Sequence, residues 1–221
     1  MSNASKAESA ARVSSTVPDE AVVRYPVFEI FHSLQGEGYH TGRAAVFVRL
    51  GGCDNGCEWC DTKEAQTTAG CRWMTGGEIS RLVAEAGART AVVTGGEPLI
   101  WNLDALTEAL HAGNIEVFLE TSGTHPLSGC FDWICLSPKS FAPPVEANFA
   151  AADELKVVAG VSDSDFEYAE ECASKTGADC RLFLQPEWNR RREAVPRIVE
   201  YIKSHPKWRL SLQTHKFIEI P

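Results

Sequence analysis

Short apolar runs alternate with amphipathic segments along most of the chain, and this alternation restricts the folds that it can adopt. The runs are rich in Val, Ile, Phe and Leu and are too short for independent helices, which is typical of strands. We expect strands at residues 44–50, 90–94, 115–119, 133–136, 155–158, 181–184 and 208–212. Helical spacing of apolar residues occurs at 79–86 and 195–202, and more weakly at 103–110 and 166–172. This alternation predicts an α/β fold with a mostly parallel sheet.

Polar or glycine-rich clusters follow directly after six of these strands. They lie at residues 51–60, 95–98, 120–123, 137–139, 185–187 and 213–216. In parallel α/β folds the carboxyl ends of the strands share one face, and binding sites form there. A single cluster of this kind is usually a turn. Six of them predict that the clusters converge on one cavity.

Cys53, Cys57 and Cys60 lie in the first cluster and are separated by three and then two residues. A loop of this length can turn three thiolates towards one point, and soft thiolates select zinc, copper(I) or iron–sulfur clusters. Structural zinc usually takes four protein ligands, and no fourth Cys or His lies within the motif; Cys71 is the nearest candidate. The spacing favours an iron–sulfur cluster, while a zinc site and bystander cysteines stay open as alternatives.

Charge and composition exclude several classes of function. The 221 residues carry a formal net charge of -9, without the basic footprint of a nucleic-acid binder, so we expect no nucleic-acid partner. No apolar run approaches the roughly 20 residues that span a membrane, and a secretory signal is not visible. We therefore expect a cytoplasmic protein without a membrane partner, in which clustered cysteines bind metal or do chemistry.

The domain organisation is expected to be simple. Residues 1–20 are rich in Ser and Ala and poor in large apolar residues, so we interpret them as a disordered N-terminal tail. The chain has no internal repeat and no internal low-complexity linker. Residues 21–221 are therefore predicted to form a single catalytic domain.

Two segments resemble the signature of the radical S-adenosylmethionine superfamily. The loop from Cys53 to Cys60 carries the cysteine spacing, with the aromatic Trp59 immediately before the third Cys. Residues 94–98 (TGGEP) are similar to the glycine-rich segment that receives the amino group of S-adenosylmethionine, and glycines let backbone carbonyls approach a ligand closely. The resemblance implies a 4Fe–4S cluster on Cys53, Cys57 and Cys60, with one open iron that binds S-adenosylmethionine.

Several further motifs resemble one family within this superfamily, 7-carboxy-7-deazaguanine synthase. They cover nearly the whole chain after the tail and agree in order. They are residues 29–38 (EIFHSLQGEG), 47–50 (FVRL), 60–62 (CDT), 120–123 (ETSG), 136–139 (LSPK), 154–158 (ELKVV), 185–186 (QP), 208–216 (WRLSLQTHK) and 220–221 (IP).

This resemblance implies a fold, a reaction and partners. The fold would be a partial, open βα barrel of the radical SAM type with reduced helix content. The reaction would convert 6-carboxy-5,6,7,8-tetrahydropterin to 7-carboxy-7-deazaguanine with loss of ammonia, a carbon–nitrogen lyase step in 7-deazapurine and queuosine biosynthesis. The cofactors would be the 4Fe–4S cluster, S-adenosylmethionine and Mg²⁺. The partners would be the pterin substrate, a one-electron reductant such as flavodoxin or ferredoxin, and a second copy in a homodimer.

Carried over to this chain, the resemblance also implies the site residues. The substrate would contact Leu34, Gln35, Gly36, Glu37, Arg49, Thr94 and the terminal carboxylate of Pro221. S-adenosylmethionine would contact Trp59, Cys60, Asp61, Gly96, Glu120, Ser137, Pro138, Lys139, Gln185, Pro186, Glu187 and Trp188. Thr62 would donate its hydroxyl to Mg²⁺, with substrate and water supplying most of the octahedron.

Plainer interpretations compete with these roles. Taken alone, Arg49 is more often a surface or paired arginine, and Thr62 would most often cap a helix. Cys135 and Cys172 fall in apolar patterns and are predicted to be core residues, while Cys71, Cys130 and Cys180 have no assigned role.

Two other functions also stay open. A radical enzyme that activates a glycyl-radical partner shares the cysteine loop and the glycine segment, but leaves the 35–38 motif and the terminal Pro unexplained. A zinc-bound interaction domain is the non-enzymatic alternative.

Overall fold

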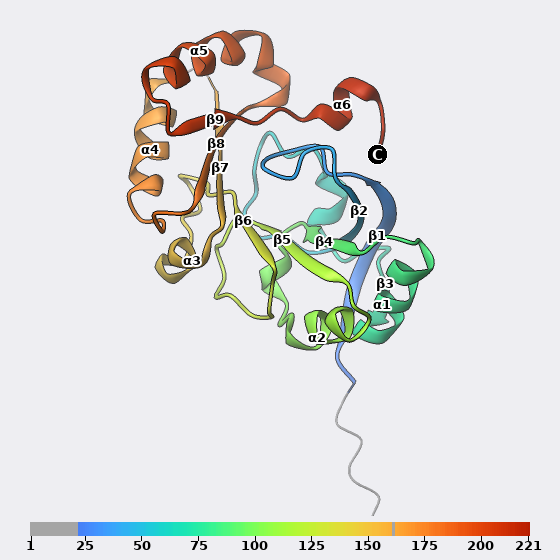
Figure 1. Ribbon diagram of the computed structural model, residues 1–221. Helices are drawn as coiled ribbons and strands as arrows, with labels where there is room; N and C mark the ends of the chain where they lie inside the picture. Colours follow the sequence, from blue (N-terminus) through green and yellow to red (C-terminus); the bar gives the residue numbers. More distant parts are fainter. Residues whose placement is uncertain (1–21, 161) are drawn as a thin grey trace, which may run out of the picture.

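The structure is a computed structural model that describes residues 22–160 and 162–221, and its strands form one curved, open sheet (Figure 1). The spatial order is β3 (Arg72–Thr75), β1 (Arg24–Leu34), β2 (Ala44–Leu50), β4 (Thr90–Gly95), β5 (Glu116–Thr121), β6 (Trp133–Leu136), β7 (Glu154–Ala159), β8 (Arg181–Pro186) and β9 (Trp208–Leu210). Strands β2 and β4 to β9 are parallel, and β1 is antiparallel to both of its neighbours. The sheet is therefore mostly parallel, as predicted.

Helices cover the outer face of this sheet (Figure 1). They are α1 (Gly76–Glu85), α2 (Asp104–Ala112), α3 (Glu146–Ala151), α4 (Asp163–Ala173) and α5 (Arg191–Ser204). The terminal helix α6 (Thr214–Ile218) lies apart from them beyond β9, and the short 3-10 turns are η1 (Lys63–Gln66), η2 (Pro98–Ile100) and η3 (Trp188–Arg190). The start of α1 is fixed by a capping box, in which the Thr75 and Glu78 side chains each accept a backbone N–H of the other residue.

The outer face of the sheet holds the hydrophobic core. Val46 and Val48 of β2 are fully buried with Ile79 of α1 in one cluster. Leu155 of β7 and Ile198 of α5 belong to a second cluster at the other end of the sheet. Cys135 and Cys172 are buried, which confirms their predicted place in the core.

The inner face of the sheet is apolar near the amino ends of the strands and polar at their carboxyl ends. Side chains two residues apart on a strand point to the same face, so Phe47 and Arg49 of β2 lie on the inner face together, as do Phe118 and Glu120 of β5. Phe47 and Phe118 pack with Trp133 in a small apolar cluster near the amino ends of the strands. The carboxyl ends of the strands present polar side chains on the inner face. A polar site can therefore form at this end of the sheet.

Most predicted elements are confirmed, with shifted ends. The strands at 44–50 and 133–136 have their predicted bounds, whereas the last strand ends at Leu210 instead of residue 212. Strands β1 and β3 and helices α3 and α6 were not predicted. The predicted tail at residues 1–20 lies outside the described residues. Within the described part, no helix has the length and apolar character to cross a membrane.

A candidate active site at the carboxyl ends of the strands

A cavity of about 400 Å³ lies at the carboxyl ends of the strands, on the inner side of the sheet. All six polar clusters predicted after the strands contribute residues to its wall, so their expected convergence is confirmed. The lining residues are Phe31, Leu34, Gln35, Gly36, Glu37, Phe47, Arg49, Cys53, Asn55, Cys57, Trp59, Cys60, Asp61, Thr62, Gln66, Thr94, Gly95, Gly96, Glu120, Thr121, Ser122, Ser137, Lys139, Lys156, Val158, Gln185, Pro186, Glu187, Trp188, Gln213, His215, Lys216 and Pro221.

The cysteine loop is anchored where it leaves β2. The Gly52 N–H donates to the Ala65 carbonyl at 2.9 Å, and the Cys53 N–H donates to the Gln66 carbonyl at 3.0 Å. Gly96, at the end of β4, packs directly beneath this anchor. A Cβ at Gly96 would lie 2.3 Å from the Gly52 carbonyl oxygen and 2.6 Å from the Cys53 Cβ. The glycine segment therefore allows the loop and β4 to approach each other, which is a role for Gly96 in addition to the predicted ligand contact.

The three loop cysteines fit an iron–sulfur cluster by their chemistry and their placement. Cys53, Cys57 and Cys60 are free thiols, partly buried, and all three line the same cavity. Burial raises the pKa of the Cys53 and Cys57 thiols, so these groups need a bound metal to be held as thiolates. Across residues 22–160 and 162–221, no three Cys, His, Asp or Glu side chains are gathered around a position for one metal ion.

A buried carboxylate fixes the wall beside this loop. Glu97 accepts hydrogen bonds from the Thr121 hydroxyl at 2.6 Å and from the Ser122 N–H at 2.8 Å. Asn55, inside the cysteine loop, donates to the Ser122 hydroxyl at 2.8 Å, and this hydroxyl in turn donates to Glu97. The loop is thus connected through β5 to the end of β4. Glu97 lies within the TGGEP motif, where the sequence alone indicates no role for it.

Lys139 follows β6 and faces the cysteine loop. Its ammonium donates to the backbone carbonyl of Ser137 at 2.6 Å and to the Ser137 hydroxyl at 2.8 Å. Burial lowers the pKa of Lys139, partly offset by the nearby Cys57. Trp59, which lines the cavity, contacts Phe141 edge to face with ring centroids 5.5 Å apart.

The floor of the cavity is an ionic ring. Lys156 of β7 donates to Glu37 at 2.6 Å and to Glu120 at 2.9 Å. Gln35 donates to the second oxygen of Glu120 at 3.1 Å and accepts the Glu37 N–H at 3.2 Å, which closes the ring. Burial would raise the pKa of Glu37, but Lys156 outweighs it and lowers this pKa to about 2. Burial would lower the pKa of Lys156, yet neighbouring acidic groups including Glu120 and Glu37 raise it well above its ordinary value.

The C-terminal segment 211–221 crosses the mouth of the half-barrel. Figure 1 shows the chain passing from β9 through α6 to the side of β1 and β2, where it ends. Gln213 donates to Glu37 at 2.9 Å and to Asp61 at 3.0 Å, and Lys216 donates to Asp61 at 2.5 Å. The segment ends at Pro221, whose carbonyl oxygen accepts the Ser33 hydroxyl at 2.7 Å. These contacts connect the cavity floor, the cysteine loop and β1.

Arg49 of β2 provides a positive charge at the cavity wall. Its Nε donates to Glu29 of β1 at 2.7 Å, and its guanidinium lies over the Phe31 ring. The pairing agrees with the plain interpretation of Arg49 as a paired arginine, but the side chain also lines the cavity. A guanidinium that pairs through Nε keeps further N–H donors for a ligand.

Almost all predicted site residues lie around this one cavity. The exception is Pro138, which is buried and does not line it, because the chain turns its neighbours Ser137 and Lys139 inward instead. Gln213, His215 and Lys216 were expected at the cavity only as members of the 213–216 cluster, without individual roles, and Lys156 was not expected among the lining residues. The sequence places Lys156 in the 154–158 motif and the other three residues in the cluster after the last strand. Nothing in the local sequence indicates that the side chain of Lys156 points into the cavity.

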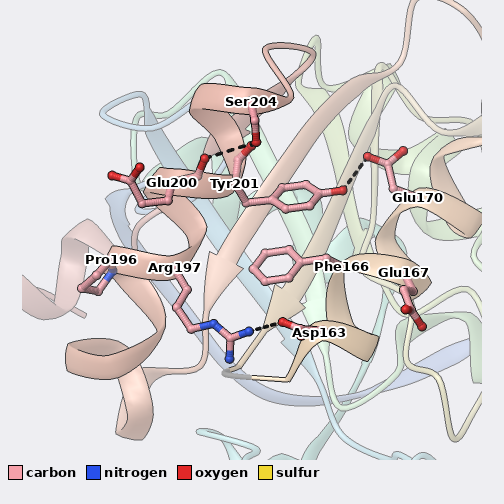
Figure 2. A pocket seen from close by; sticks show the side chains of 9 residues that line it. All are labelled: Asp163, Phe166, Glu167, Glu170, Pro196, Arg197, Glu200, Tyr201 and Ser204. Atoms are coloured by element: carbon pink, nitrogen blue, oxygen red, sulfur yellow. Dashed lines mark hydrogen bonds and ion pairs between the residues drawn. The ribbon is translucent and has the colours of Figure 1, made fainter.

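A second and larger hollow, of about 960 Å³, lies between α4 and α5 (Figure 2). Two pairs of its polar side chains contact each other: Arg197 contacts Asp163, and the Tyr201 hydroxyl donates to Glu170 at 2.9 Å. Phe166 and Tyr201 stack with ring centroids 4.3 Å apart. None of the predicted site residues lies in this groove. The chemistry therefore belongs to the cavity at the strand ends.

Residues 47–156 match the model of the radical SAM superfamily. Together with the open barrel and the cysteine loop at its mouth, this defines a radical SAM protein. A curated 7-carboxy-7-deazaguanine synthase from Flavobacterium psychrophilum is 49% identical, with 89% of this chain and 92% of the relative covered. One from Synechocystis sp. is 46% identical, with 90% of this chain and 94% of the relative covered. The chain belongs to the 7-carboxy-7-deazaguanine synthase family.

A solved structure agrees with this assignment. The crystal structure of QueE from Escherichia coli matches with a TM-score of 0.78 and 31% sequence identity, and the match covers 87% of this chain and 95% of that one. The predicted α/β fold, an open βα barrel of the radical SAM type, is therefore confirmed. Membership of this family does not favour the glycyl-radical activator or the zinc-bound interaction domain.

Proposed function

We propose that this chain converts 6-carboxy-5,6,7,8-tetrahydropterin to 7-carboxy-7-deazaguanine with loss of ammonia, in queuosine or a related 7-deazapurine pathway. One observation carries the proposal beyond the family resemblance: a single cavity brings together the cysteine loop, a cationic wall at Arg49 and an acidic floor at Glu37 and Glu120. A small, polar heterocycle with one carboxylate matches this distribution of charge.

The cysteine loop would hold the 4Fe–4S cluster on Cys53, Cys57 and Cys60. When bound, the cluster and S-adenosylmethionine supply the one-electron chemistry that activates a substrate C–H bond. The protein positions S-adenosylmethionine with lining residues from four strand ends. We assign this role to Trp59, Asp61, Gly96, Ser137, Lys139, Gln185, Pro186, Glu187 and Trp188. We place Glu120 on the substrate side instead, because it shares Lys156 with Glu37.

The substrate would lie between the two charged sides of the cavity. Its carboxylate would face Arg49, since a guanidinium suits bidentate recognition of a carboxylate. Its ring would contact the segment from Leu34 to Glu37 and the Thr94 side chain. Pro221 would contribute the carboxylate of the chain terminus. All of these residues line the cavity.

Thr62 would provide a hydroxyl to Mg²⁺. It occupies the N-cap position of η1, but its side chain makes no capping hydrogen bond there. Thr62 therefore has the position of a helix cap without capping through its side chain, and the residue lines the cavity that would hold the substrate. Substrate and water oxygens would complete the octahedron.

The reaction also needs partners. A one-electron reductant such as flavodoxin or ferredoxin would have to reach the cluster, and a reducing cytoplasm would keep the three thiols available. The homodimer is proposed from the family resemblance.

Arg49→Ala is expected to weaken substrate binding selectively. Losing a charge-assisted hydrogen bond costs about 1.5–3 kcal/mol, so KM for the pterin should rise about 10- to 100-fold. Anaerobic steady-state kinetics with the pterin as the varied substrate measure this, and the affinity for S-adenosylmethionine should stay unchanged. Arg81→Ala is the matched control, because Arg81 pairs with Glu85 on exposed α1. An unchanged KM in Arg49→Ala would remove Arg49 from the substrate site.

A further inference from the structure

Strand β7 holds the loop that carries the substrate motif. This loop, residues 35–43, connects β1 to β2 and contains Gln35, Gly36 and Glu37. Glu154 and Lys156 are two residues apart on β7, so both point to the inner face of the sheet. Each of them contacts the loop through a separate hydrogen bond. The 154–158 motif thereby gains a role that the sequence did not indicate.

Glu154 contacts the loop at its middle. Its carboxylate accepts the Tyr39 N–H at 3.1 Å and the indole N–H of Trp133 at 3.2 Å. Gly38 packs so closely that an added Cβ would lie 1.9 Å from a Glu154 oxygen, and its φ of +65° also favours glycine. The loop therefore packs directly on the Glu154 side chain.

Lys156 contacts the loop at its substrate end. Its side chain is only 4% exposed, and its ammonium lies between Glu37, 119 residues earlier, and Glu120 of β5. Besides Lys156, each carboxylate accepts a hydrogen bond from a neutral amide: Gln213 donates to Glu37, and Gln35 donates to Glu120. The two carboxylates thus face the cavity in fixed orientations, with Lys156 as their common partner.

The buried ion pairs of Lys156 with Glu37 and Glu120 contribute little to the stability of the fold. A buried ion pair must repay the desolvation of its charges, and well-packed apolar residues in its place are often equally stable or more stable. The ring also carries one net negative charge, because two carboxylates share one ammonium. Its physical effect is to present oriented acceptors at the floor of a cavity that Arg49 also lines.

We propose that Lys156 is a positioning residue for substrate recognition. It holds the loop carboxylate of Glu37 beside Glu120, so that the pair accepts hydrogen bonds from N–H groups of the substrate ring. This inference rests on the proposed function, because it takes the nitrogen-rich pterin as the ligand. Lys156 acts through the two carboxylates and does not itself react.

The test uses the cluster-loaded protein and 6-carboxypterin, an oxidised ligand that does not turn over, with binding followed by pterin fluorescence. Lys156→Met should bind it at least about 10-fold more weakly, because the two carboxylates lose the orientation in which they accept hydrogen bonds from the ligand. A 10-fold change corresponds to about 1.4 kcal/mol of binding free energy. Lys156→Arg should recover most of the affinity. Hydrogen exchange should accelerate in peptides covering residues 35–43 and stay unchanged in α1. Lys203→Met is the control, because Lys203 pairs with Glu200 on the surface of α5.

The outcomes separate this inference from the proposed function. If the wild-type protein does not bind 6-carboxypterin, the proposed function fails. If the wild-type protein binds it and Lys156→Met binds equally well with unchanged exchange in the loop, the positioning role is wrong. Should Lys156→Met fail to fold by circular dichroism, Glu37→Gln decides, since it keeps Lys156 paired with Glu120. Weaker binding by Glu37→Gln supports the role of the carboxylate pair, and wild-type affinity overturns it.

Discussion

Cys57→Ala should lose iron and activity together. Two thiolates cannot retain a 4Fe–4S cluster that three hold, and the reaction depends on that cluster. The fold should survive, because Cys57 lies in a loop outside the two main hydrophobic clusters. Iron and sulfide content after anaerobic reconstitution, with circular dichroism as a check on folding, measures the effect. The wild-type protein should be brown and contain about four iron and four sulfide per chain.

The matched control for this substitution is Cys130→Ala. Cys130 is exposed and does not line the cavity, so its variant should keep full iron content and activity. Retention of about four iron by Cys57→Ala would contradict the assignment of the loop. A colourless wild-type protein with one zinc would favour the interaction domain instead.

A short extension after Pro221 should reduce activity severely. The terminal residue lines the cavity, and its carbonyl oxygen accepts the Ser33 hydroxyl of β1. An added segment converts the terminal carboxylate to a neutral peptide and places new residues at the cavity wall. Losing a charged hydrogen-bonding group costs about 1.5–3 kcal/mol, so kcat/KM should fall about 10- to 100-fold, and crowding should add to this loss.

The same extension at the amino terminus is the control. Strand β1 begins at Arg24, at the opposite end of the strand from Leu34 and the cavity. An amino-terminal tag should therefore leave kcat/KM close to that of the untagged chain. Equal activity of the two tagged proteins would show that the terminal carboxylate has no part in the reaction.

The strands could be predicted from the sequence where a run of apolar residues matches a segment that is buried in the fold. Strand β2 reads as a continuous apolar run because it pairs with β1 and β4 inside the sheet, and its bounds were predicted without error. Strand β1 has no such pattern: it is long, half-exposed along much of its length and contains Pro26. A Pro within a run argues against a strand, but here it lies on β1 where this strand pairs with the short edge strand β3.

The site was predictable in outline, because polar clusters after parallel strands must share one edge of the sheet. Its internal connections were not. The partners Lys156 and Glu37 are 119 residues apart, and Gln213 and Glu37 are 176 apart, so no local spacing indicates either contact. Glu97 was missed for a similar reason: its carboxylate is buried against the end of β5, which only the tertiary structure reveals.

The central claim is that this cavity contracts a pterin ring with cluster-bound S-adenosylmethionine. Anaerobic turnover of the fully clustered protein with a reductant, S-adenosylmethionine and 6-carboxy-5,6,7,8-tetrahydropterin tests it most directly, with products identified by mass spectrometry. We predict that 7-carboxy-7-deazaguanine and ammonia accumulate together, and only when all three components are present. Absence of 7-carboxy-7-deazaguanine from a fully clustered, reduced sample would contradict the account.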